Sequence, residues 1–155
     1  MKIVSFNINS IRARPHQLIH LRDTIDPDVI GLQETKVNDP DFPIEVIEEI
    51  GYHPEYWGQK GHYGVAILSK LKPTKTIKGF FPQGENIHHE TKFPKKIKYY
   101  EDLKKHIEVL KKSKENLIVM GDFNVAPKDI DIGIGSENVK RWLRDGKTSF
   151  QPQER

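Results

Sequence analysis

The sequence predicts a single α/β domain, because short apolar runs typical of strands alternate with stretches that have helical periodicity. The chain has 155 residues, which is the size of one ordinary domain that can bury a hydrophobic core. It shows neither an internal repeat nor a low-complexity linker that would divide it. We therefore expect one α/β domain over residues 1–155.

Each expected element rests on its apolar pattern and on the residues that bound it. Residues 2–8 alternate as in a strand, and proline at position 15 suits the first turn of a helix. Residues 29–32 and 117–120 are apolar runs without alternation, typical of strands covered on both faces. The expected strands are 2–8, 29–32, 52–57, 65–68 and 117–120, and the expected helices are 15–25, 44–50, 94–112 and 139–144.

The composition excludes several classes of protein. Hydrophobic residues make up 35% of the chain, and no apolar run is long enough to span a bilayer. The N-terminus lacks the apolar stretch of a signal peptide. The chain has no cysteine, which excludes disulfides and thiolate metal sites. We therefore expect a cytoplasmic monomer without a membrane partner.

The net charge of +3 is compatible with a nucleic-acid partner. The same basicity can arise from AT-rich coding, because lysine is much more frequent than arginine and isoleucine than alanine. Charge alone is therefore weak support for DNA binding.

Two of the apolar runs lead directly into an acidic residue. Glu34 follows the run 29–32 after one glutamine, and Asp122 follows the run 117–120 after one glycine. Hard carboxylate oxygens at the rim of a sheet suit Mg²⁺, with Mn²⁺ as an alternative ion. Asn7 ends the first strand and Asn124 lies two residues beyond Asp122, so both can supply amide groups to a phosphate or a water.

A single acid after a strand is more often a turn former or a helix cap than a metal ligand. The functional interpretation therefore rests on two such strand ends, each with an amide nearby. Arg12 and Arg14 follow the first strand and are natural phosphate contacts, an interpretation that we favour slightly over solvated surface charge.

Several segments of the chain resemble, in the same order, those of exonuclease III-type apurinic/apyrimidinic endonucleases, within the endonuclease/exonuclease/phosphatase superfamily. The resemblance is closest to the bacterial exonuclease III branch and covers essentially the whole chain. Several independent motifs in order make it far more specific than one short pattern. The segments are FNINSIRAR at 6–14, PDVIGLQETK at 27–36, the glycine-rich loop 58–66, FPQGE at 81–85, GDFN at 121–124, DIGIG at 131–135 and RWL at 141–143.

The resemblance implies a four-layer α/β sandwich of two packed sheets flanked by helices. It also implies a Mg²⁺-dependent hydrolase of base excision DNA repair, with abasic-site endonuclease and 3′–5′ exonuclease activity on duplex DNA. By position, Glu34 resembles the principal metal ligand, with Asn7, Asp122 and Asn124 around the same metal. Asp122 resembles the catalytic aspartate that helps activate the attacking water or protonate the leaving group, and Asn124 the amide that steadies the phosphate.

The sequence also departs from the family pattern. The family continues for a substantial stretch, with another catalytic aspartate and a closing Ser-Asp-His segment, and none of the seven histidines here lies in such a context. The family has about two more strands before FPQGE, ending in a tyrosine where Phe80 stands here. Ser10 replaces a common glycine. We therefore expect an incomplete sandwich, with a deletion junction near 79–82, a missing C-terminal portion and impaired or absent activity.

Two alternatives remain open at this point. Besides the DNA-repair phosphodiesterase, the chain could be a non-catalytic DNA-binding remnant, or a phosphatase of the same superfamily that acts on lipid or inositol headgroups. The Gln-Glu-Thr-Lys context of Glu34 and the Arg-Trp-Leu segment argue against the phosphatase.

Overall fold

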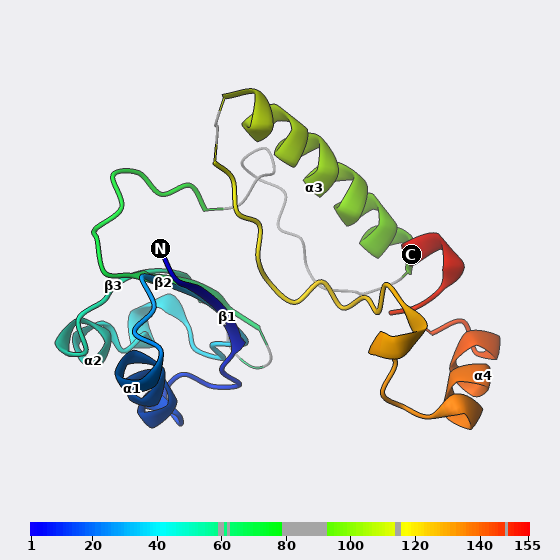
Figure 1. The fold of residues 1–155 in the computed structure, drawn as a ribbon, viewed down its shortest axis with the longest axis horizontal. Coiled ribbons are helices and arrows are strands. Elements are labelled where there is room, and N and C mark those ends of the chain that lie inside the picture. The colour runs from blue at the N-terminus through cyan, green and yellow to red at the C-terminus, as the bar shows by residue number, and fades with distance from the viewer. Residues whose placement is uncertain (59–60, 62, 79–92, 114–115, 148) are drawn as a thin grey trace. The chain divides into compact units, whose positions relative to one another are not determined.

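The computed structural model describes residues 1–58, 61, 63–78, 93–113, 116–147 and 149–155 (Figure 1). The chain divides into two compact units, which are described separately. The sheet unit comprises Met1–Gly79 and Val119–Asp122, and the helical unit comprises Phe80–Ile118 and Phe123–Arg155. The expected deletion junction near 79–82 lies outside the described residues, and the extent of the domain stays a prediction.

The sheet unit contains a four-stranded mixed sheet with the strand order β1-β2-β4-β3. The first two strands are parallel, whereas β4 is antiparallel to both of its neighbours, β2 and β3. A short 3₁₀ turn at Asp39–Asp41 precedes the second helix. The strands are β1 (Ile3–Asn7), β2 (Val29–Gln33), β3 (His53–Trp57) and β4 (Val65–Ser69), and the helices are α1 (Pro15–Thr24) and α2 (Ile44–Glu49).

The core of the sheet unit lies between the sheet and its two helices, which cover the same face (Figure 1). Leu18 of α1 and Ile47 of α2 are fully buried and belong to one cluster with alternate residues of the strands. Ile30 pairs with Leu68 across the sheet, so both point into this cluster. The pattern of apolar residues thus places each helix on the sheet by burying one side of it.

On the other face of the sheet, the central strand is covered at Gly31 by Met120 of the same unit. A Cβ atom at Gly31 would lie 2.8 Å from the Met120 Sδ. Ile30, Gly31 and Leu32 are all buried, which confirms the prediction that this strand is covered on both faces. Farther out on β4, by contrast, Val65 and Ile67 are about half exposed.

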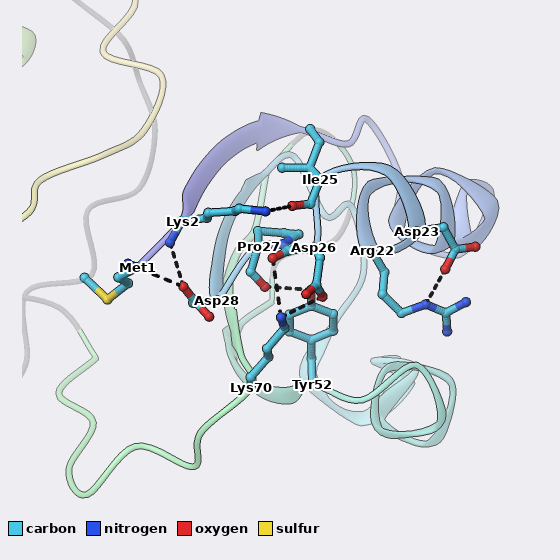
Figure 2. Close-up of polar contacts among 10 residues, drawn as sticks. All are labelled: Met1, Lys2, Arg22, Asp23, Ile25, Asp26, Pro27, Asp28, Tyr52 and Lys70. Atoms are coloured by element: carbon cyan, nitrogen blue, oxygen red, sulfur yellow. Dashed lines mark hydrogen bonds and ion pairs between the residues drawn. The ribbon is translucent and has the colours of Figure 1, made fainter.

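A group of polar contacts fixes the amino ends of the parallel strands, where α1 leads into β2 (Figure 2). The Lys2 backbone N–H donates to Asp28 Oδ2 at 2.6 Å, and the buried Tyr52 hydroxyl donates to the carbonyl of Pro27 at 2.8 Å. The Lys70 ammonium lies 2.6 Å from Asp26 Oδ1 and lowers the pKa of that carboxyl. These contacts lie at the end of the strands opposite to Asn7 and Gln33.

The helical unit contains the long helix α3 (Phe93–Ser113) and the shorter helix α4 (Ser136–Arg144), with 3₁₀ turns at Asp129–Asp131 and Pro152–Glu154. Helix α4 begins three residues before its expected start at 139, after Gly135 at φ +77°. The Trp142 ring is half-buried and stacks on Phe150, with ring centroids 6.1 Å apart. No helix of the described ranges is long and apolar enough to cross a membrane.

The prediction of a buried strand at 117–120 is wrong. These residues form no ladder, and Ile118 and Val119 are 53% and 44% exposed. The apolar run satisfies the side-chain requirement of a buried strand, but a strand also needs neighbours for its backbone hydrogen bonds. Within the described part of the chain no strand pairs with this run.

Candidate active site

The carboxyl ends of β1 and β2 bring two of the predicted site residues together. The strands are parallel and pair Asn7 with Gln33, so the residue after each strand emerges at the same edge of the sheet. The Asn7 Nδ2 donates a hydrogen bond of 2.9 Å to Glu34 Oε1. Asn7 Oδ1 accepts the backbone N–H of Asn9 at 3.1 Å, so the amide is held at both ends.

Left-handed backbone conformations surround this carboxylate. Glu34 has φ +53° and Lys36 φ +56°, and in the loop after β1 Asn9 has φ +47° and Ser10 φ +87°. Non-glycine residues rarely adopt this region, and such residues are common at functional sites, where the surrounding structure holds them. The positive φ of Ser10 also gives a physical reason for the glycine that the resembling family commonly has there.

Hydrogen bonds between three loops hold this strained edge. The Ser10 N–H donates to the carbonyl of Glu34 at 2.8 Å. On the other side, the N–H groups of Thr35 and Lys36 donate to the carbonyls of Gly64 and Tyr63 at 3.1 and 2.8 Å. The loops after β1 and β2 and the residues before β4 therefore fix one another, and the position of the Glu34 side chain follows from that network.

Lys36 belongs to the site although the sequence did not single it out. Its ammonium lies 3.0 Å from Glu34 Oε2 and donates to Asn9 Oδ1 at 2.5 Å. Glu34 and Lys36 are two residues apart, and in a strand such side chains point to the same face. Here β2 has already ended, and the left-handed φ angles of both residues set the direction of the Lys36 side chain. The only sequence signal was a lysine two residues after the acid. The Glu34 carboxylate thus has a cation beside it and an amide donor on its other oxygen.

Asp122 belongs to the sheet unit, at the end of the segment 119–122. The Met120 side chain against Gly31 places this segment on the strand that leads to Glu34. Asp122 itself is exposed. The structure therefore assigns Asp122 to the unit that carries Asn7 and Glu34.

Asn124 belongs to the helical unit, where it adopts φ +51°. The two arginines remain at the start of α1: Arg12 is exposed, and Arg14 is the half-buried residue before the first helical position. Neither arginine is part of the Asn7–Glu34 contact, so their predicted role in DNA binding stays a prediction.

The residues at this edge fit a magnesium ion held mainly by water and substrate. Among the described residues, no group of three or more His, Asp or Glu side chains gathers around a common point. Mg²⁺ commonly uses only one or two protein carboxylates and keeps several waters. Glu34 offers a carboxylate that the Asn7 amide orients. The Lys36 ammonium beside it shows that a positive charge is accommodated next to this carboxylate. These hard oxygen ligands suit Mg²⁺ better than they suit softer metals.

Comparison with known proteins places this geometry in a family. Residues 4–152 match the Endonuclease/Exonuclease/phosphatase family, and the chain belongs to that family. It is 48% identical to exodeoxyribonuclease III of Haemophilus influenzae, over all of this chain and 69% of that protein. That alignment runs over 184 positions, so at least 29 of them have no residue in this chain of 155.

Two solved structures give the same result at the level of the fold. An AP endonuclease from Archaeoglobus fulgidus is 29% identical, with a TM-score of 0.74 over 99% of this chain and 66% of that one. A 3′ phosphatase from Neisseria bound to a product DNA hairpin is 25% identical, with a TM-score of 0.85 over 100% of this chain and 67% of that one. The chain thus spans about two thirds of the length of these relatives.

The predicted family and α/β fold are therefore confirmed. The relatives are an exodeoxyribonuclease, an AP endonuclease and a 3′ phosphatase bound to DNA. Together they support a DNA-repair phosphodiesterase.

Proposed function

We propose that this chain carries the metal-binding part of a Mg²⁺-dependent phosphodiesterase of base excision repair, with Mn²⁺ as an alternative ion. Its substrate is duplex DNA with abasic sites or 3′ ends. The observation that carries this proposal is the Glu34 carboxylate at the carboxyl edge of the parallel strands, oriented by Asn7 at 2.9 Å and facing the Lys36 ammonium at 3.0 Å. A cytoplasmic, monomeric protein without a membrane partner belongs to the same proposal.

In this proposal Glu34 holds the metal, and Asn7 orients the carboxylate. A divalent ion held there would supply Lewis-acid stabilisation of the negative charge that develops on the phosphate group. Asp122 helps activate the attacking water or protonate the leaving group, and Asn124 donates its amide to the phosphate. These roles follow the family pattern carried over by position.

Arg12 and Arg14 add contacts to the DNA backbone. They follow β1 in the sequence and lie just before α1, and guanidinium groups suit phosphate oxygens. Backbone contacts of this kind position the duplex without reading its sequence.

The proposal includes strongly reduced turnover for this polypeptide. Phe80 stands where the resembling family has a tyrosine in the active site, so the phenolic hydroxyl is absent at this position. Loss of a positioned acid or base costs roughly 10²–10⁴-fold in rate even when the other groups are in place. Metal and DNA binding are therefore expected to survive better than cleavage.

The test is binding and cleavage of a fluorescent duplex with one abasic site, measured by anisotropy and by gel in Mg²⁺ and in EDTA. We expect binding that Mg²⁺ strengthens and Glu34→Gln weakens, with cleavage far slower than that of a complete family enzyme. Glu45→Gln on the exposed side of α2 removes the same charge away from the edge and serves as the control.

Three outcomes would count against parts of the proposal. Cleavage at the rate of a complete enzyme would overturn the claim of reduced turnover. Binding that is indifferent to Mg²⁺ and to Glu34→Gln would favour a non-catalytic DNA-binding remnant. Light scattering that gives a mass well above 18.0 kDa would overturn the monomer.

A further inference from the structure

A buried ion pair in the helical unit has no part in the roles proposed so far. The Lys96 ammonium of α3 lies 2.6 Å from Glu154 Oε1, and the Glu154 side chain has no exposed surface. Oε2 of the same carboxylate accepts the backbone N–H groups of Ser149 and Gln151 at 2.8 and 2.9 Å. Burial opposes ionisation, but Lys96 and these N–H groups outweigh it and lower the pKa of Glu154.

The same Lys96 ammonium also holds the backbone of a candidate site residue. It donates a hydrogen bond of 2.7 Å to the carbonyl oxygen of Asn124. One turn farther along α3, the Tyr100 hydroxyl donates to the carbonyl of Phe123. Because residues four apart lie on the same side of a helix, α3 holds two successive carbonyl groups of this segment.

The segment needs such support because Asn124 has a left-handed backbone, at φ +51°. A non-glycine residue keeps that conformation only when its neighbours enforce it. Two residues later, the Ala126 N–H donates to the carbonyl of Ser149 at 2.6 Å, so the segment 123–126 is fixed on both sides of Asn124. Ser149 is also a donor to Glu154, which links both supports to one carboxylate.

We propose that Lys96 and Glu154 are positioning residues, which fix the backbone at Asn124 so that its amide is presented to the phosphate. This inference rests on the proposed role of Asn124. Lys96 supplies the bond to the Asn124 carbonyl, and Glu154 keeps the ammonium in place. The proposal gives neither residue a contact with DNA, since their side chains are 14% and 0% exposed. The alternative is an ion pair that only stabilises the fold. Removing such a pair would lower stability without a specific effect on the backbone at Asn124.

The first test asks whether the pair controls the segment at Asn124. Amide hydrogen exchange of residues 124–126 is compared between the wild type, Lys96→Met and Glu154→Gln under native conditions. We expect exchange faster by roughly tenfold or more in both variants, because a charge-assisted hydrogen bond is lost. Lys111→Met, an exposed lysine near the end of α3, is the matched control and is expected to leave this exchange unchanged.

The second test asks whether the pair acts through Asn124. Affinity for the abasic duplex in Mg²⁺ is measured for Lys96→Met, for Asn124→Ala and for the double variant. We expect Lys96→Met to weaken binding several-fold beyond Lys111→Met, which removes the same charge, and to have no further effect in the Asn124→Ala background. A structural ion pair would weaken both backgrounds equally.

If Lys96→Met is too unstable to study, Tyr100→Phe removes only the bond to the Phe123 carbonyl and is expected to give a smaller change in the same direction. Unchanged exchange at 124–126 in every variant would overturn the proposal. Equal losses of affinity in both backgrounds would also overturn it. If Asn124→Ala itself binds like the wild type, the proposed role of Asn124 fails, whereas faster exchange would still establish the link between Lys96 and the segment.

Discussion

The contact between Gly31 and Met120 gives a direct test of how the segment 119–122 reaches the sheet. An added Cβ atom at Gly31 would lie 2.8 Å from Sδ, 3.0 Å from Cε and 3.2 Å from Cγ of Met120. All three atoms belong to one flexible side chain, so Gly31→Ala forces Met120 to turn away rather than displacing backbone. The substitution therefore probes this one contact.

The expected magnitude follows from two opposing effects. Overpacking by one methyl group costs about 1–2 kcal/mol when the neighbour must leave a good position. Replacing glycine by alanine in a strand recovers about 0.5 kcal/mol through the lower entropy of the unfolded chain. We expect Gly31→Ala to lower the free energy of unfolding by about 1 kcal/mol in the wild type, and to raise it by about 0.5 kcal/mol when Met120 is alanine.

The assay is a double-mutant cycle by urea denaturation, with Gly31→Ala, Met120→Ala and the double variant followed by circular dichroism. The expected coupling energy is about 1.5 kcal/mol. Gly51→Ala is a useful contrast, because nothing lies within 4 Å of its added Cβ but its φ is +92°, so its cost comes from backbone strain and is independent of Met120. Additive effects of Gly31→Ala and Met120→Ala, within about 0.3 kcal/mol, would refute the placement of the segment 119–122 on β2.

Four further predictions concern residues near the candidate site and the buried ion pair. Ser10→Gly relieves a backbone at φ +87° and is expected to raise the free energy of unfolding by roughly 0.5–1 kcal/mol in urea denaturation. The buried Thr35 Oγ1 has no hydrogen-bond partner in the described part of the chain, so Thr35→Val is expected to stabilise the protein by about 1 kcal/mol, and a loss of stability would contradict this. Lys36→Met removes the cation beside Glu34 and is expected to tighten Mn²⁺ binding several-fold in calorimetric titration, whereas weaker binding would show that Lys36 does not occupy the place of the metal. The pKa of Glu154 is lowered in the folded state, so its ionised carboxylate stabilises the protein fully above the ordinary pKa of a glutamate. This stabilisation is lost as the pH falls through the lower pKa of the folded state. The wild type is therefore expected to lose more stability on acidification than Glu154→Gln.

The sequence predicted the sheet unit well because its elements depend on local patterns. Apolar alternation located β1, and a continuous apolar run located β2. Parallel pairing of these two strands is what places Asn7 beside Glu34, so that contact follows from the fold. The helix that begins at Pro15 was predicted because proline favours the first helical turn.

Other features could not be predicted, because they depend on backbone conformations and partners that are distant in sequence. Lys36 reaches Glu34 through left-handed residues, whereas sequence periodicity assumes regular φ and ψ angles. The run 117–120 was assigned to a strand on its composition, but strand formation needs a pairing partner. Lys96 is one of several lysines in the expected helix 94–112, and only the fold brings it to Glu154, 58 residues away in the sequence.

The network around Glu34 is the structural reason for proposing that this chain keeps metal binding better than it keeps turnover. The contacts described around the carboxylate are made by residues 7–11, 33–36 and 63–64. Local stability depends on such nearby contacts, so these three loops are expected to hold the carboxylate in place. The proposed turnover, in contrast, also depends on groups outside this edge, and Phe80 stands where the resembling family has a tyrosine in the active site. The proposal therefore expects a preorganised carboxylate that binds a divalent ion while cleavage is slow, and the EDTA and Glu34→Gln experiments test these two expectations separately.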